Sequence, residues 1–325
     1  MSTTTPTRAA SEQSTPKRPV RRGIMPFATG RSYWWYLVPG FLLLVAIILV
    51  PLGWNVWLSF TDYRGILAPR FTGLDNWERL VGDDRFWLSF RNSLAMIAAM
   101  VVAPTLLGLV VAAALFDVIG RRFGGRIAAF LRATYYLPQI LPSVIAAIVI
   151  GWILRPENGA LNTILDAVGL GALSANWLGS PDTALASIMV VLVWIQIGYP
   201  VVVFMAALQR VDPELYEAAE LDGAGWFHRF RAITLPMIRP ETFVVALTCT
   251  IAALKVFGPV YALTGGGPNN ATIVPSYYSY AQFFQAQQVG YGAAIATALT
   301  VVIVLVSTVF IWAQNRMERA ETGLS

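Results

Sequence analysis

The sequence predicts an all-α membrane protein with six transmembrane helices. Of its 325 residues, 56% are apolar and only 13% are charged, about half the charged fraction of roughly 25% that is usual in soluble domains. Six apolar runs reach or approach the ~20 residues needed to cross a bilayer core. Because a backbone in lipid must satisfy its own hydrogen bonds, each run is expected to be a helix. The runs are Tyr36–Leu58, Asn92–Phe116, Tyr135–Leu154, Ala184–Leu208, Phe243–Leu263 and Ala293–Trp312.

Proline occurs inside most of these runs. It has no N–H to donate, so kinks or local unwinding are expected where it lies. Residues 1–32 are rich in Ser, Thr, Pro and Arg and lack apolar periodicity, which predicts a disordered cytoplasmic tail. Residues 33–315 are expected to form one transmembrane domain, and residues 316–325 a second cytoplasmic tail. The prolines are Pro51, Pro104, Pro138, Pro142, Pro200 and Pro259.

The distribution of Lys and Arg predicts the orientation of these helices. Sixteen of the 23 basic residues lie in the two tails and in the loops 117–134 and 209–242. The three remaining loops hold six, five of them in the loop 59–91. Because basic residues concentrate on the cytoplasmic side, both termini and the loop 209–242 are expected in the cytoplasm.

The loop 209–242 contains a polar stretch between two apolar runs. Asp212 suits the N-cap of a helix, and Pro213 suits its first position. Gly223 suits the end, where a left-handed backbone favours glycine. A second short helix is expected over Trp226–Ile233, ending before Pro236, which breaks the pattern.

The spacing within this loop resembles the EAA loop of ABC importer permeases. Glu217, Ala218 and Ala219 are followed by Gly223, and an Ile-x-Leu-Pro sequence begins at Ile233. The resemblance implies that the loop docks in a cleft of a cytoplasmic ATPase, with Glu217 pairing with an arginine there. The alternative is an ordinary amphipathic helix on the membrane surface. The resemblance assigns ATPase coupling to Glu217, Ala218, Ala219, Asp222, Gly223, Leu235 and Pro236.

Two further motifs narrow the resemblance to sugar-type permeases of the maltose/glycerol-3-phosphate/trehalose group, over about residues 35–315. The segment 71–77 resembles the F-x-G-L-x-N-[FYW] element of such permeases. The segment 264–268 resembles the T-x-G-G-P motif, which begins an outer loop facing the solute-binding protein. The residues assigned to that loop are Thr264, Gly266, Gly267 and Pro268.

The resemblance implies an ABC type I importer permease fold, a location in the plasma (inner) membrane of a prokaryote, and a set of partners. These are a second permease subunit, two copies of a cytoplasmic ABC ATPase, a periplasmic or extracellular solute-binding protein, and membrane lipid; nucleic acid is not expected. ATP and Mg would be bound by the ATPase. The glycine-rich segment 264–268 lacks the Gly-Lys-Ser/Thr of a phosphate-binding loop. With one histidine, one cysteine and no hydrolase motif, neither an enzyme nor a metal site is expected.

A path for the solute is expected at the level of the membrane. Lys255 is the one charged residue within a predicted span, and a charge at mid-depth costs at least ~2.5–3.5 kcal/mol unless it faces a cavity or a partner. It either lines the solute path as a hydrogen-bond donor or makes a structural pairing with a helix carbonyl or with the partner permease. The resemblance places the path between the third and fifth helices, although apolar residues stand where a maltose permease has amides. The residues assigned to the path are Ile148, Trp152, Tyr199, Ala252, Lys255, Val256, Phe257 and Tyr261.

Two other classes of membrane protein are alternatives to an ABC importer permease. A secondary transporter driven by an ion gradient would require paired intramembrane carboxylates and inverted repeats, and neither is visible in the sequence. A membrane scaffold or receptor would need neither kinked helices nor a loop of fixed spacing. The sequence therefore favours a permease subunit that couples ATPase motion to alternating access for a carbohydrate.

Overall fold

The computed structural model describes residues 34–115 and 125–321 of the chain. The expected disordered tail at the N-terminus lies outside the described residues, and so does part of the expected loop 117–134. At the other end, α17 (Val289–Glu321) extends into the expected C-terminal tail, whose first residues are helical.

The chain divides into two compact units after Pro51. The described part of the first unit consists of α1 (Trp34–Leu44), a π turn η2 (Val45–Leu49) and the first residues of α2 (Val50–Leu58). Together these elements form an apolar helical span over Tyr36–Leu58, with the bounds predicted for the first transmembrane helix.

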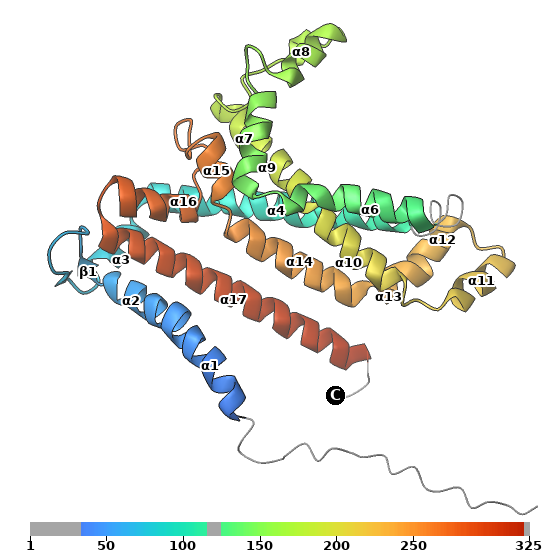
Figure 1. Cartoon of the computed structure of the whole chain (residues 1–325), viewed down its shortest axis with the longest axis horizontal. Helices are drawn as coiled ribbons and strands as arrows, with labels where there is room; N and C mark the ends of the chain where they lie inside the picture. The colour runs from blue at the N-terminus through green and yellow to red at the C-terminus, as the bar shows by residue number, and fades with distance from the viewer. Residues whose placement is uncertain (1–33, 116–124, 322–325) are drawn as a thin grey trace, which may run out of the picture. The chain divides into compact units, whose positions relative to one another are not determined.

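The second unit is a bundle of helices arranged around α4 (Asp84–Ala113). Three helices that come much later in the sequence pack against it: α9 (Pro181–Gln196), α10 (Gly198–Leu208) and α14 (Arg239–Leu254) (Figure 1). The side chain of Asp83 caps α4 by accepting a hydrogen bond of 2.9 Å from the N–H of Arg85.

Two buried clusters of apolar side chains hold this bundle together. The first core cluster joins α4 and α9 to the C-terminal elements and includes Met96, Ile188, Val260, Tyr277 and Ile295. The second core cluster joins α4 to α10 and α14 and includes Leu109, Phe204, Ile238, Val245 and Cys249. Each cluster therefore connects α4 to helices that are distant in sequence.

By length and composition, four helices in the described residues could cross a membrane, or six if each of two bent pairs is one span. The prediction of an all-α membrane protein is thus confirmed, but the third span is not one helix. α6 (Gly125–Ile140) and α7 (Ser143–Ile153) meet at 95°. The break falls at Leu141 and Pro142, where proline supplies no N–H to continue the helix.

The fifth predicted span, Phe243–Leu263, is also interrupted. α14 ends at Leu254, and a short helix α15 (Gly258–Leu263) begins after three non-helical residues. Lys255 is the C-cap of α14 and is exposed. The expected intramembrane charge therefore lies at a helix break rather than within a continuous helix.

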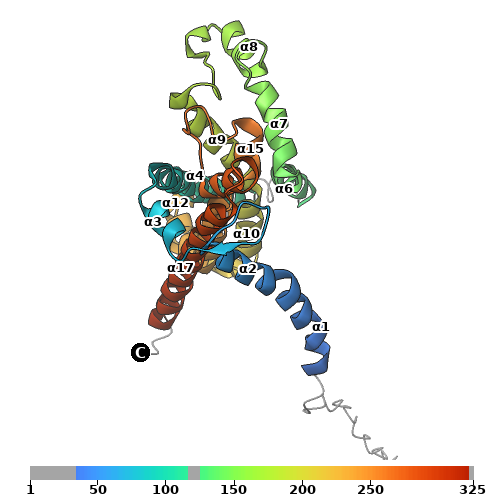
Figure 2. The ribbon, with the colours of Figure 1, turned by 90° about the vertical axis from the view of Figure 1, so that its left-hand side faces the viewer.

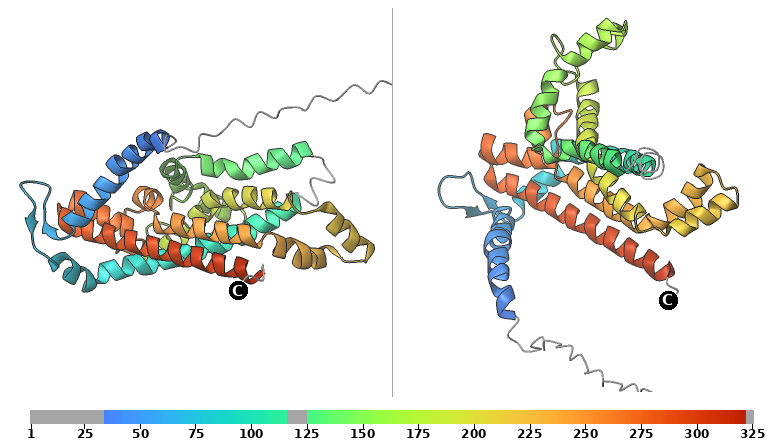
Figure 3. Two further views of the ribbon diagram at one scale, coloured as in Figure 1. Left: turned by 90° about the horizontal axis from the view of Figure 1, so that it is seen from below. Right: turned by 45° about the vertical axis from the view of Figure 1, so that its right-hand side comes forward.

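The remaining elements connect these helices in sequence. They are β1 (Thr61–Asp62) paired antiparallel with β2 (Arg70–Phe71), α3 (Asp75–Val81), α8 (Ala160–Ala167), η4 (Gly171–Leu173), α16 (Pro275–Tyr280) and η6 (Ala281–Gln285). Figure 2 shows α7 and α8 extending away from α4 and α17. Figure 3 shows the two strands and α3 at one end of the second unit and the polar loop after α10 at the opposite end.

Candidate coupling loop and solute path

The polar loop after α10 begins with α11 (Pro213–Leu221), whose bounds agree with the sequence prediction. Asp212 is the N-cap, and its side chain accepts a hydrogen bond of 3.0 Å from the N–H of Glu214. Pro213 occupies the first helical turn, where no N–H is needed. The start of the helix is therefore set by local chemistry.

The C-terminus of α11 is a Schellman motif. Gly223 has a φ of 75°, its N–H donates to the Glu220 carbonyl at 3.0 Å, and the N–H of Ala224 donates to the Ala219 carbonyl at 2.9 Å. These two bonds satisfy carbonyls that would otherwise lack a partner. Glycine is required at this turn because L side chains rarely adopt the left-handed backbone.

The second helix of the loop is longer than predicted. α12 (Trp226–Arg229), a π turn η5 (Phe230–Thr234) and α13 (Leu235–Met237) follow one another without a gap. The expected stop before Pro236 is therefore wrong. The wider π turn ends at Thr234, and Pro236 is the second residue of α13, where proline is tolerated because it lies at the start of a helical segment.

Three side-chain contacts fasten this loop. The Tyr216 hydroxyl lies 3.0 Å from Oγ1 of Thr234, and both residues are buried. Nη1 of Arg229 donates to Oε2 of Glu220 at 2.8 Å. These contacts hold α11 against the segment α12–α13. A third contact, between Arg210 and Glu241, joins the end of α10 to the start of α14.

Removal of the Tyr216 hydroxyl should loosen the loop. Tyr216→Phe leaves the buried Thr234 hydroxyl without this partner, which costs about 1–3 kcal/mol. We expect a lower melting temperature and a several-fold fall in solute-stimulated ATP hydrolysis by the complete transporter. Tyr216→Phe combined with Thr234→Val removes both hydroxyls and should restore most of the stability; an equally unstable double variant would show that the contact is not the cause.

The residues assigned to ATPase coupling lie mostly on the exposed face of the loop. Glu217, Ala218, Asp222, Gly223, Leu235 and Pro236 are exposed, and Ala219 is half-buried. A hollow of about 510 Å³ opens between α11 and α12. Its lining includes Ala219, Asp222, Gly223, His228 and Arg229. The loop thus offers both a projecting helix and a concave surface to a partner.

The residues assigned to the solute path fall into two groups. Ile148 and Trp152 are exposed on α7, which packs against α15. Phe257 and Tyr261 stack with their ring centroids 5.5 Å apart on the far side of the helix break. The structure therefore places an aromatic pair close to the exposed Lys255.

The other path residues are more enclosed. Val256 is buried in the first core cluster, and its carbonyl, freed by the helix break, accepts a hydrogen bond from the Ser276 hydroxyl. Ala252 packs against the same cluster. Tyr199 packs against the second core cluster and donates to Oγ1 of Thr248 at 3.3 Å.

Two aromatic residues near this path are not among those that the sequence assigned to it. Tyr280 of α16 lies 5.2 Å from the Phe257 ring and 5.5 Å from the Tyr261 ring, between centroids. Tyr277 lies 6.4 Å from each of the same two rings. The pattern Tyr-Tyr-Ser-Tyr at residues 277–280 was the available signal, but nothing local shows that α16 folds back onto α15.

The T-x-G-G-P segment positions Tyr277. Gly266 has a φ of 79°, and a Cβ at this position would lie only 2.7 Å from Cε1 of Tyr277. The Thr264 and Thr272 hydroxyls lie 2.7 Å apart, and Thr272 also donates to the Gly267 carbonyl at 2.7 Å. Glycine is needed here because the aromatic ring occupies the space of a side chain.

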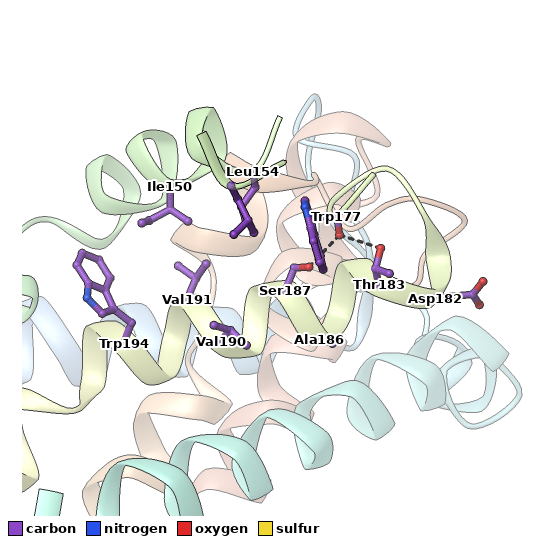
Figure 4. A pocket seen from close by; sticks show the side chains of 11 residues that line it. Ile150, Leu154, Trp177, Asp182, Thr183, Ala186, Ser187, Val190, Val191 and Trp194 are labelled. Carbon is purple, nitrogen blue, oxygen red and sulfur yellow. Dashed lines mark hydrogen bonds between the residues drawn. The ribbon is translucent and has the colours of Figure 1, made fainter. Parts of the chain in front are cut away.

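An apolar hollow of about 440 Å³ lies between α7 and α9 (Figure 4). Trp194, Val190 and Val191 line it from α9, and Ile150 of α7 and Leu154, the C-cap of α7, line it from the other side. Figure 4 also shows the Thr183 and Ser187 hydroxyls donating to the Trp177 carbonyl, at 3.1 and 3.0 Å. These two hydroxyls are thereby paired, and Asp182 is the charged residue of a lining that is otherwise mainly apolar.

Asp83 joins three elements at the end of the bundle that carries the T-x-G-G-P segment. Its Oδ2 accepts a hydrogen bond of 2.5 Å from the Tyr278 hydroxyl and another from the Tyr291 hydroxyl. Burial alone would raise the pKa of Asp83, but these bonds and two from backbone N–H groups lower it below the usual value of an aspartate. Burial, and then the bond to Asp83, raise the pKa of Tyr278 to about 12.

Acid is therefore expected to weaken this junction. Because the pKa of Asp83 is lower in the folded state than the unfolded value of about 3.9, its stabilising effect is complete above that value and is lost as the pH falls through the folded pKa. Thermal unfolding of the purified chain should show this loss, and Asp83→Asn should be less stable at neutral pH but less sensitive to acid. An unchanged acid dependence in Asp83→Asn would rule out this residue as the source.

Comparison with known proteins identifies the family. Residues 104–322 match the family described as binding-protein-dependent transport system inner membrane component. A probable ABC transporter permease of Pyrococcus horikoshii is 32% identical over 87% of this chain and 96% of its own length. The trehalose/maltose transport system permease MalF of Thermococcus litoralis is 33% identical over 87% of this chain and 93% of its own length.

Two solved structures share the fold. A bacterial ABC transporter for import of the polysaccharide alginate superposes with a TM-score of 0.76 at 21% identity, covering 88% of this chain and 95% of that one. The same kind of transporter in complex with an alginate pentasaccharide-bound periplasmic protein gives 0.73 at 23% identity, covering 90% and 95%. The prediction of a type I importer permease fold is thereby confirmed.

The family and its relatives are transport components, which confirms the prediction that this chain is not itself an enzyme. Its several apolar helices, and the fold shared with solved permeases, agree with a multi-pass membrane protein. The match covers the bundle from the middle of α4 to the end of α17, including the polar loop after α10. The chain belongs to the family of inner membrane components of binding-protein-dependent transport systems.

Proposed function

We propose that this chain is one of two permease subunits in an ATP-driven importer of a saccharide. The main support is the polar loop that contains α11. The N-terminus of this helix is capped by Asp212, its Tyr216 is hydrogen-bonded to Thr234, and Glu217 is exposed at one end of the bundle. The saccharide class is supported by relatives named for trehalose/maltose and, at 36% identity in Streptomyces coelicolor, diacetylchitobiose.

Energy for transport would come from a separate ATPase that binds ATP and Mg. Closure of two ATPase copies would draw two coupling loops together, one from each permease. Because Tyr216 and Arg229 fasten α11, and Arg210 is paired with Glu241 at the base of the loop, the motion passes to α10 and α14. Those helices pack on α4, so their movement changes the access of the path between the two permeases.

The orientation follows from charge and from the position of the two motifs. The coupling loop and the T-x-G-G-P segment lie toward opposite ends of the second unit (Figures 1 and 3). With the basic residues on the cytoplasmic side, the coupling loop reaches the ATPase. The T-x-G-G-P segment then faces a periplasmic or extracellular solute-binding protein.

Lys255 is the one charged group among the assigned path residues. It is exposed at the break between α14 and α15, next to the stacked Phe257 and Tyr261. An exposed ammonium group within the membrane needs a cavity or a partner. Sugar hydroxyls can accept hydrogen bonds from the ammonium group, while the aromatic rings can contact the C–H faces of the sugar.

Lys255→Met should change solute preference or raise the solute concentration for half-maximal uptake several-fold. The assay is uptake into vesicles containing the complete transporter, for a panel of disaccharides. Lys255→Arg keeps the charge and serves as the control. An unchanged profile for Lys255→Met would assign this lysine to a structural pairing instead.

The experiment that tests the function is purification of the tagged chain from its native membrane in mild detergent. Mass spectrometry should find a second permease and an ATPase, and adding the sugar-loaded binding protein should stimulate ATP hydrolysis. If the chain purifies alone and binds no ATPase on mixing, the coupling assignment fails. An ion-gradient-driven carrier would then be the leading explanation.

A further inference from the structure

A polar hollow of about 430 Å³ lies beside the T-x-G-G-P segment, at the end of the bundle away from the coupling loop. We propose that it is an outer saccharide-binding site, occupied by the solute before it reaches the level of Lys255; this inference rests on the proposed function. The polar and aromatic side chains of its lining are Arg85, Asn270, Tyr277, Tyr278, Gln282 and Gln285.

The chemistry of this lining suits a polyhydroxylated ligand. Amides both donate and accept hydrogen bonds, as sugar hydroxyls do. Oε1 of Gln282 is buried and has no hydrogen-bond partner among the described residues. Arg85 is the one charged residue of the lining, which favours neutral or acidic sugars over cations.

The walls of the hollow are held in place before any ligand arrives. Asn92, buried in α4, donates to the carbonyls of Ala271 and Ile273 at 3.1 and 2.9 Å. These bonds fix the loop that carries Asn270. On the other side, the bond from Tyr278 to Asp83 fixes α16. Because these side chains and loops are already ordered, a small ligand can bind without the entropic cost of ordering them.

Tyr277 links this hollow to the path within the membrane. One part of the side chain lines the hollow, while its ring belongs to the group formed with Phe257, Tyr261 and Tyr280. Lys255 is close to this group in sequence and ends α14. A sugar leaving the hollow would therefore pass Tyr277 before it reaches the exposed Tyr261 and Lys255.

The size of the hollow favours a small solute over a protein. Pockets of roughly 300–1,000 Å³ are typical of small-molecule sites, whereas docking proteins bury about 800 Å² on each partner, mostly on broad surfaces. The competing occupant is a side chain or loop of the solute-binding protein. The test must separate these two occupants.

The test uses the complete transporter, reconstituted without its binding protein, in a Cys249→Ala background. Gln285→Cys places a single thiol on the exposed edge of the hollow, and Ile66→Cys places one on an exposed loop outside it. The rate of modification by a membrane-impermeant thiol reagent is measured with and without maltose, trehalose or diacetylchitobiose. We expect at least one disaccharide to slow modification of Gln285→Cys several-fold and to leave Ile66→Cys unchanged.

The same protection should disappear when Gln282→Leu is added to Gln285→Cys, with an unchanged labelling rate in the absence of sugar showing that the variant is folded. No protection by any of the three sugars, or protection that survives Gln282→Leu, overturns the proposal. Protection by the sugar-free binding protein alone also overturns it and assigns the hollow to docking. Sugar-stimulated ATP hydrolysis is scored separately, so the importer function can stand when this site fails.

Discussion

Glu217→Lys should abolish solute uptake while leaving membrane insertion and binding of the solute-binding protein intact. Glu217 is exposed on α11, so its carboxylate is available to a cationic residue of the ATPase. Replacing it with lysine turns attraction into repulsion at the interface. Loss of a paired interfacial charge costs about 2–5 kcal/mol, which is a factor of about 30 or more in affinity.

The measurement is uptake by vesicles, together with the amount of ATPase that co-purifies with the variant. Glu157→Lys makes the same charge change at an exposed position on the predicted outer side and should transport normally. Uptake at the normal rate by Glu217→Lys would disprove the docking assignment. Loss of both insertion and uptake would show a folding defect instead. Glu217→Gln is a smaller change at the same position, and it would separate loss of the charge from a defect in folding.

Gly198→Val should destabilise the bundle itself. Gly198 begins α10 where that helix crosses α6, and a Cβ there would lie 2.6 Å from the Tyr135 carbonyl oxygen and 2.7 Å from Cα of Tyr136. Both obstacles are backbone atoms, so only separation of the two helices would relieve the clash. Overpacking of this kind typically costs about 1–3 kcal/mol, and more where the backbone must move.

The melting temperature of the purified chain and its amount in the membrane would show this effect. Gly53→Val is the matched control, because a Cβ at Gly53 would have no neighbouring atom within 4 Å. The control should be nearly as stable as the unmodified chain. Equal stability of Gly198→Val would mean that α6 and α10 do not approach this closely.

Local chemistry accounts for much of what could be predicted. The apolar runs determine that the chain is helical and suited to a membrane, because an unpaired backbone is too costly in lipid. Asp212, Pro213 and Gly223 determine α11, since a capping side chain, a missing N–H and a left-handed turn act within a few residues. The same polar stretch carries the spacing by which the family could be predicted.

Tertiary packing decided the features that depend on distant residues. The sequence indicates a kink near Pro138 and Pro142, but the angle of 95° between α6 and α7 and the packing of α7 on α15 are visible only in the folded chain. The grouping of Tyr277 with Phe257 depends on the return of α16 across α15, and Asn92 finds its partners some 180 residues later in the chain. Hydrophobic periodicity describes which face of a helix is apolar, but it carries no information on which helix covers that face. The coupling helix was therefore predictable from the sequence, whereas the outer hollow and the aromatic group became visible only in the folded chain.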